Sequence, residues 1–123
     1  MQDQPSPDTI RELANALLKG IEPTSARAKF ETRMATSALD LVKRAAELRP
    51  SYDAKELIRL TALLDEKGDL KTLNRRLCER IRDGSLALSS PGLAAHLRAT
   101  TMEKLAIDQP GYATYRRALE TGE

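Results

Sequence analysis

Apolar residues recur every three or four positions along most of the chain, which is the spacing of α-helices that bury one face. The longest such segment runs from Thr24 to Arg49, and neither Gly nor Pro interrupts it between Ser25 and Pro50. At about 100° per residue, two apolar rows together cover roughly half of its circumference. The rows consist of Phe30, Met34, Ala38, Leu41, Ala45 and Leu48, and of Ala35, Leu39, Val42 and Ala46. So wide an apolar face predicts a long helix with several neighbours.

Local start and stop signals predict a helix before this segment and another directly after it. Ser6-Pro7-Asp8 predicts the first start, because Ser caps a helix, Pro fits its first turn and Asp favours its positive end. Gly20 predicts a left-handed end to that helix. Asp53 and Glu56 form a capping box beyond Pro50, so a separate third helix is expected there. Gly68 is expected to end it.

The carboxyl-terminal half shows three further helix starts. Asp69 predicts the fourth helix, which Gly84 ends, and a short connector with apolar Leu86 and Leu88 follows. Ser90-Pro91 repeats the opening signal of the first helix, and Pro110 predicts a short last one. The inner face of the fifth helix is expected to consist of Ala94, Leu97, Thr101 and Leu105.

No segment alternates with the period of a strand. Six helices with short connections predict an all-α fold, a single domain over residues 1–123. We expect a mainly antiparallel bundle around the long second helix, preceded by a short mobile lead-in at residues 1–5.

Composition narrows the functional classes. Aromatic residues are 3% of the chain and Trp is absent, so the core must consist mainly of Leu and Ala. Charged residues are 31%, but the net charge of +2 gives no general attraction for nucleic acid. Cys78 is the single cysteine and is expected to be a buried, inert thiol. No targeting signal or membrane-length apolar run is present, so a cytoplasmic protein is expected.

Three stretches together resemble a known family. They are Leu77-Cys78-Glu79-Arg80-Ile81-Arg82-Asp83-Gly84, residues 95–100 continuing to 104–110, and residues 28–35 leading to Ala38-Leu39. They resemble a family of small bacterial all-helical proteins of unknown function, often encoded beside aminoglycoside-phosphotransferase-like kinases and acyl-CoA dehydrogenases. The resemblance covers nearly the whole chain and implies a link to one of those proteins, but no established chemistry. The chain departs from it at Glu31, where members often have His, and at Ser37, where they often have Asn.

His96 is the only imidazole and the first candidate for chemistry. It falls away from the apolar row of the fifth helix, so it could move protons or respond to pH, although a solvated or packing role is more common. No carboxylate or nucleophile is placed beside it by sequence spacing. One His, one Cys and scattered carboxylates form no cluster at zinc or di-iron spacing, so we assign no catalytic residue, metal or cofactor.

Two charged features have a functional and a structural interpretation. The basic residues of the fourth helix could form the recognition helix of a helix-turn-helix DNA-binding motif, or an exposed face with i, i+4 pairs such as Arg75–Glu79. The balanced net charge favours the exposed face. Arg27 and Glu31 could form a partly buried ion pair on the long helix, but a solvated helix end is favoured.

The leading hypothesis is a non-enzymatic accessory module that binds a protein partner or a second copy of itself. By resemblance, the partner would be a phosphotransferase-like kinase or an acyl-CoA dehydrogenase. The alternative is a small-molecule or acyl-group binder, with an apolar cleft between helices guarded by Arg33, His96 or Arg98. The last helix carries Tyr112, Tyr115 and Leu119 on one side, which either form a self-association surface or close the core.

Overall fold

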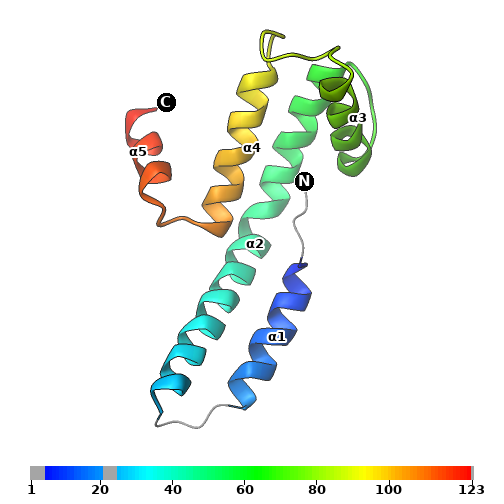
Figure 1. Ribbon diagram of the computed structural model, residues 1–123. Coiled ribbons are helices and arrows are strands. Elements are labelled where there is room, and N and C mark those ends of the chain that lie inside the picture. The colour runs from blue at the N-terminus through cyan, green and yellow to red at the C-terminus, as the bar shows by residue number, and fades with distance from the viewer. Residues whose placement is uncertain (1–4, 21–24, 123) are drawn as a thin grey trace. The chain divides into compact units, whose positions relative to one another are not determined.

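The computed structural model describes residues 5–20 and 25–122. Within these ranges the chain forms five helices and no strand. They are α1 (Pro7–Lys19), α2 (Ala26–Leu64), α3 (Leu70–Arg82), α4 (Leu93–Asp108) and α5 (Ala113–Thr121), as Figure 1 shows. The all-α class and the long second helix are confirmed, whereas the count of six helices is wrong. Most of the predicted lead-in and the connection at 21–24 lie outside the described residues.

The expected third helix is the second half of α2, which continues through Pro50 for 39 residues in all. Proline in a helix interior costs about 3 kcal/mol because it lacks an N–H and its ring clashes with the preceding turn. The covered positions Ala45, Tyr52, Glu56 and Leu60 nevertheless keep helical spacing across Pro50, so burial favours an unbroken helix. Glu56 does not serve as the expected capping residue, because its carboxylate accepts a hydrogen bond from Asn74 of α3.

The chain divides at Pro50 into two compact units, of which the first ends at Arg49. Its described part consists of α1 and the first half of α2, which run side by side in Figure 1. Ser6 caps α1 as predicted, with its hydroxyl accepting a hydrogen bond from the backbone N–H of Thr9 at 3.3 Å. Gly20 ends α1 but is not left-handed, since its φ is −91°.

Only part of the predicted wide apolar face of α2 is covered in this first unit. The buried residues are small: Ala28, Ala35, Val42 and Ala45, opposite Ala14 of α1. Small side chains let two helices approach closely. The other predicted row begins with Phe30 and Met34, and these side chains are 56% and 52% exposed. The expectation that neighbours cover both rows is wrong for Phe30 and Met34, which α1 does not cover.

The second unit, residues 50–122, has a leucine core built by α2, α3 and α4. Its buried members are Leu60, Leu64, Leu73, Leu77 and Leu93. Leu86 of the connector packs against this core as expected, but Leu88 is largely exposed. The chain leaves α2 through Asp65, which has a left-handed φ of 52°, so α2 ends before the predicted stop at Gly68.

The predicted cap of α3 is confirmed and that of α4 is not. Asp69 accepts a hydrogen bond from the backbone N–H of Thr72 at 2.8 Å. This bond is the main reason that the pKa of Asp69 lies below its usual value. The hydroxyl of Ser90 instead accepts a hydrogen bond from the backbone N–H of Ala87, so it does not cap α4. Helix α4 begins after Gly92, whose φ is 87°. The last helix likewise begins three residues after Pro110.

The buried face of α4 differs from the expected one. It consists of Leu93, His96, Thr100 and Ile107, whereas Ala94, Leu97 and Thr101 are exposed. The apolar residues of α4 itself are distributed around its whole circumference, so their spacing alone does not identify which side is buried. Cys78 is also exposed, contrary to expectation, because it lies about 100° around α3 from buried Leu77.

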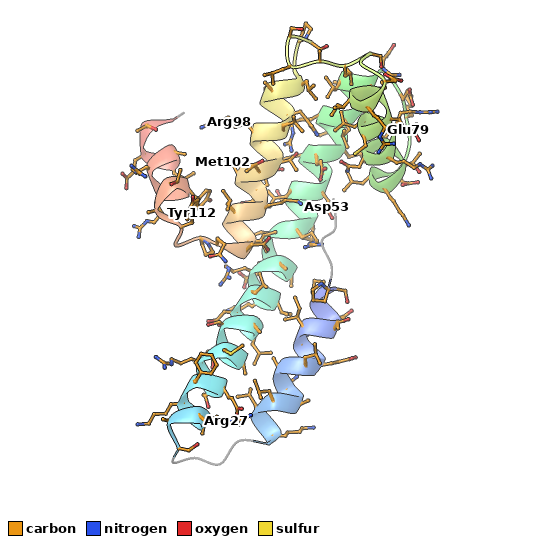
Figure 2. All side chains as sticks on the ribbon, viewed as in Figure 1. Arg27, Asp53, Glu79, Arg98, Met102 and Tyr112 are labelled. Atoms are coloured by element: carbon orange, nitrogen blue, oxygen red, sulfur yellow. The ribbon has the colours of Figure 1, made fainter. Side chains whose placement is uncertain are left out.

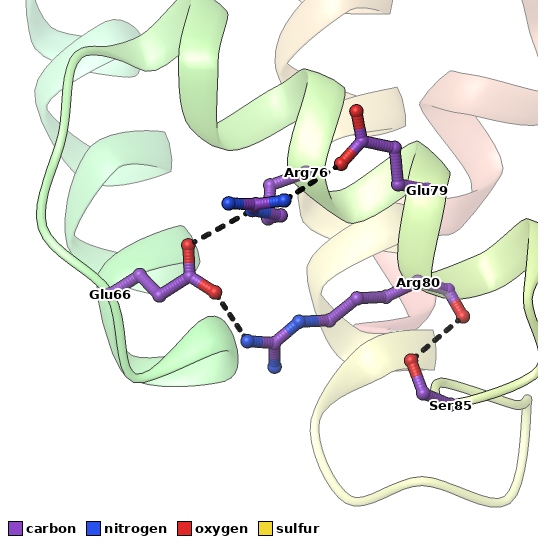
Figure 3. A network of polar contacts seen from close by, with 5 residues as sticks. All are labelled: Glu66, Arg76, Glu79, Arg80 and Ser85. Atoms are coloured by element: carbon purple, nitrogen blue, oxygen red, sulfur yellow. Dashed lines mark hydrogen bonds and ion pairs between the residues drawn. The ribbon is translucent and has the colours of Figure 1, made fainter.

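Two basic side chains of α3, Arg76 and Arg80, pair with Glu66, which follows the end of α2 (Figure 3). Glu66 accepts from Arg76 at 3.3 Å and also pairs with Arg80, while Arg76 reaches Glu79 at 3.1 Å. These contacts, rather than the expected Arg75–Glu79 pair, neutralise part of the basic run. That lessens the electrostatic basis for DNA binding, which stays untested.

Candidate functional site

A cluster of polar side chains is buried in the second unit, between α2, α3 and α4. Its most buried members are Glu56, Asn74, His96 and Thr100. Asn74 donates to Glu56 at 3.0 Å and to the carbonyl of Leu70 at 3.1 Å. Because its amide nitrogen makes both bonds, its amide oxygen faces the other way and is buried without a partner in the described residues.

Arg59 and Glu103 join α2 to α4 by two parallel hydrogen bonds of 2.8 and 2.7 Å. Arg59 also donates to the hydroxyl of Thr100 at 3.3 Å. The hydrogen bond to Glu103 raises the pKa of Arg59 above its usual value, against the opposing effect of burial. Two parallel bonds between a guanidinium and a carboxylate are strong and directional. They fix how α4 is turned against α2.

His96 lies in this cluster with only 3% of its surface exposed. Burial lowers the pKa of the imidazole, and nearby Arg59 lowers it further, while Glu56 and Glu103 act in the opposite direction. The side chain is therefore neutral at pH 7. Its Nδ1 atom is buried and has no hydrogen-bond partner among the described residues.

An imidazole near an arginine and carboxylates has the parts of an acid–base site, but a substrate must also reach them. With so little of its surface exposed, the His96 imidazole is closed to solvent. Its observed contacts instead hold three helices in one arrangement, as buried polar networks commonly do. Of the two structural roles expected for His96, solvated or helix-packing, its burial agrees with the packing role and contradicts the solvated one, and the side of α4 on which it was placed was wrong.

Two positions in the sequence point to this cluster. Asn74 is four residues after Leu70 and three before Leu77, so it occupies a position of the apolar face of α3. Glu56 is four residues after Tyr52 and four before Leu60, so it too falls on a covered face, that of α2. Polar residues at such positions indicate a buried polar contact. Their partners could not be found, because they come from other helices.

The predicted contact residues are spread over the molecule. His96 and Arg98 are about 200° apart around α4, so they lie on nearly opposite sides of this helix. Arg98 is exposed, and Arg33 is exposed on the first half of α2, in the other unit. Of the three residues expected to guard an apolar cleft, Arg33, His96 or Arg98, it is Arg33 that lines a hollow, on α2.

Arg98 and the tyrosines do belong to one region, formed by α4 and α5. In Figure 2, Arg98 and Met102 lie on α4 and Tyr112 lies at the start of α5, which a short turn connects to the end of α4. Helix α5 has no buried residue, and Tyr112 and Leu119 are 52% and 59% exposed. Tyr112 and Leu119 therefore do not close the core. Tyr115 is half-buried and near Tyr52, whose pKa is raised by burial and further by Tyr115.

The second exposed apolar region is on α2 and contains Phe30 and Met34; we call it the strip on α2. A shallow hollow of about 530 Å³ in it is lined by Phe30, Arg33, Met34 and Ser37. Near it, Arg27 pairs with Glu31 at 2.8 Å, with the Arg27 side chain almost fully in solvent. The favoured interpretation of that pair, a solvated helix end, agrees with the exposure of Arg27, whereas the Glu31 side chain is only 23% exposed and is partly covered.

No group of three His, Cys, Asp or Glu side chains in residues 5–20 and 25–122 is placed to hold a metal ion. Within the same ranges, no helix is both long enough and apolar enough to cross a membrane.

A family model described as a domain of unknown function, DUF6285, matches residues 22–112. The chain belongs to this family. The part matched to DUF6285 contains α2, α3 and α4 entirely, with the polar cluster and the strip on α2. Helices α1 and α5 lie outside it. Comparison with curated proteins and with solved structures gave no match.

Proposed function

We propose that this DUF6285 protein is a non-enzymatic helical module that binds another protein through the α4–α5 face. We define this face as Arg98, Met102, Tyr112, Tyr115 and Leu119. The observation that supports it most is α5, a helix of nine residues of which none is fully buried and only two are partly covered. Helices this short are marginal in water, so contact with a second protein would stabilise α5.

The chemistry of the α4–α5 face also favours a protein partner. Tyr, Met and Arg are enriched in the centres of protein interfaces, where they contribute much of the binding energy. Arg98, Arg116 and Arg117 add positive charge, against Glu120 on α5. Two copies of this face would bring like charges together, so a different protein with an acidic surface fits better.

The partner that we propose is a phosphotransferase-like kinase or an acyl-CoA dehydrogenase. These classes come from the family resemblance of the sequence. The non-enzymatic role is supported by the enclosure of His96, the residue that sequence reasoning put first for chemistry. A cytoplasmic location suits the exposed thiol of Cys78, since reducing conditions keep a free thiol intact.

The test is a binding measurement between the purified chain and candidates of both classes from the same organism. We expect at least one to bind, and the double substitution Tyr112→Ala with Leu119→Ala to weaken binding by at least about tenfold. Leu88→Ala is the matched control, because Leu88 is an exposed apolar residue outside the α4–α5 face. The proposal fails if neither candidate binds, or if both sets of variants weaken binding equally.

The hollow on α2 supports a second candidate, an acyl-group binder. Its volume is in the range of small-molecule sites, and Arg33 could bind a carboxylate or phosphate. It ranks second because Phe30 and Met34 are over half exposed and would enclose a ligand poorly. A ligand of the folded state must raise the melting temperature, so unchanged melting curves with acyl-CoAs would remove this candidate.

A further inference from the structure

The strip on α2 lies on the side of that helix that α1 leaves open. Ala28, Ala35 and Val42 are buried on the covered side. At about 100° per residue, Phe30 and Met34 lie roughly 140° and 100° around the helix from Ala35. Each is more than half exposed, and Phe30 is the only Phe of the chain. A large aromatic and a methionine side by side on an open helix face indicate a binding surface.

The spacing within the strip is that of a helix-pairing seam. Phe30, Met34, Ser37 and Leu41 follow one another at intervals of four, three and four residues. This is the alternation by which side chains of one helix fit between those of another. Ser37 is the smallest of the four, and it lines the hollow together with Phe30 and Met34. A side chain from a second helix could fill that hollow.

The charges beside the seam are self-complementary. Arg33 and Asp40 are seven residues apart, which places them on the same side of the seam within about 20°. Both are exposed, and within the described part of the chain neither forms an ion pair. Each therefore has its charge available to a second molecule.

These charges select one orientation for a pair of such helices. In an antiparallel pair with a twofold axis between Thr36 and Ser37, the same side of each seam meets itself. Arg33 is then level with Asp40 of the second copy, and Asp40 with its Arg33. Met34 lies against Ser37 and Leu41 of the second copy. In a parallel pair, the side of one seam that carries Arg33 and Asp40 would lie against the other side of the second seam. Arg33 would then not meet Asp40 of the second copy.

We propose that two copies of this chain form a twofold-symmetric dimer through antiparallel pairing of the first halves of their α2 helices. The occupant of the hollow is Met34 or Leu41 of the second copy. This interface lies in residues 25–49, in the unit that does not contain the α4–α5 face.

Sedimentation equilibrium of the full-length chain tests the proposal by charge reversal. The wild-type protein is expected to dimerise, and Arg33→Asp and Asp40→Arg should each raise the dimer dissociation constant by about tenfold, because each turns two attractive contacts into repulsive ones. The double variant, Arg33→Asp with Asp40→Arg, restores both pairs with their signs exchanged. Its dissociation constant should return to near the wild-type value.

Lys43→Asp is the matched control, since it makes the same charge change on an exposed residue roughly 140° from Phe30 around the helix. It should leave the dimer unchanged, and circular dichroism should show equal helix content in all variants. The proposal is overturned if the wild-type chain is monomeric up to the millimolar range. The proposal is also overturned if the dimer dissociation constant is unchanged by Arg33→Asp and Asp40→Arg, or is raised equally by Lys43→Asp. It is overturned as well if the double variant does not restore the wild-type value. Loss of dimer on Tyr112→Ala with Leu119→Ala would instead assign self-association to the α4–α5 face.

Discussion

The contact between Arg59 and Glu103 is expected to decide how firmly α4 is held against α2. Its side chains are 25% and 16% exposed, so it lies between a surface pair and a buried one. Exposed pairs contribute about 0–1 kcal/mol. Removing one partner of a fully buried pair costs about 3–5 kcal/mol, because the remaining charge is left without a counter-charge.

The substitution Glu103→Gln keeps the shape of the side chain and removes its charge. The Gln carbonyl can still accept one hydrogen bond, but the second parallel bond and the ionic attraction to Arg59 are lost. Between the two limits we expect a loss of about 2 kcal/mol in the free energy of unfolding. For a chain of 123 residues, this lowers the melting temperature by roughly 6–10 °C.

Tyrosine fluorescence during urea unfolding is a suitable assay. The chain has no Trp, and all three tyrosines, Tyr52, Tyr112 and Tyr115, lie in residues 50–122. The signal therefore follows the unit that contains Arg59 and Glu103. Equal slopes of stability against urea in both proteins would show that the variant changes stability rather than the extent of unfolding.

Glu79→Gln is the matched control, since it makes the same change in an exposed pair with Arg76, with side chains 54% and 45% exposed. It should cost less than about 0.5 kcal/mol. A double-mutant cycle with Arg59→Met then isolates the pair, with an expected coupling energy of about 1.5–2 kcal/mol. The reasoning is refuted if Glu103→Gln costs no more than the control, or if the effects at Arg59 and Glu103 simply add.

Three further predictions concern the remaining features of the fold. Pro50→Ala should raise the free energy of unfolding by about 1–3 kcal/mol in a thermal melt, because Pro50 is inside a helix; a loss of stability would contradict the unbroken α2. Leu60→Ala should cost about 2–5 kcal/mol in urea unfolding, since Leu60 is fully buried, and an effect as small as that of exposed Leu88→Ala would contradict the leucine core. Burial keeps the pKa of His96 below 6.5, so the unfolded chain takes up the proton first as pH falls, and stability decreases below about pH 6.5. His96→Gln should flatten the melting temperature between about pH 7 and pH 5, and an unchanged slope would contradict a buried neutral imidazole.

Signals confined to neighbouring residues predicted the fold best. Ser6 and Asp69 cap their helices as the sequence indicates, because each cap depends on an N–H only three residues away. The same signals failed where distant contacts competed with them. Asp53 and Glu56 form a valid capping box, but Glu56 bonds to Asn74 instead, and burial carries the helix through Pro50.

The polar cluster was the least predictable feature. Spacing placed His96 outside the apolar row of its helix, yet it is among the most buried residues of the chain. A helix with apolar residues on every side has several possible inner faces of similar hydrophobicity. The contact between Arg59 and Glu103 distinguishes between them, and these two residues are 44 positions apart.

The sequence by itself determined that the chain is helical, where α1 and α3 begin, and that the second helix is long, because these properties depend on propensities and hydrogen bonds within a few residues. Only the tertiary structure decided which side of α4 is buried, that α2 is unbroken at Pro50, and that Phe30, Met34 and Tyr112 face solvent. These outcomes depend on which surfaces other segments cover, and the free energy of that burial comes from residues far apart in the chain.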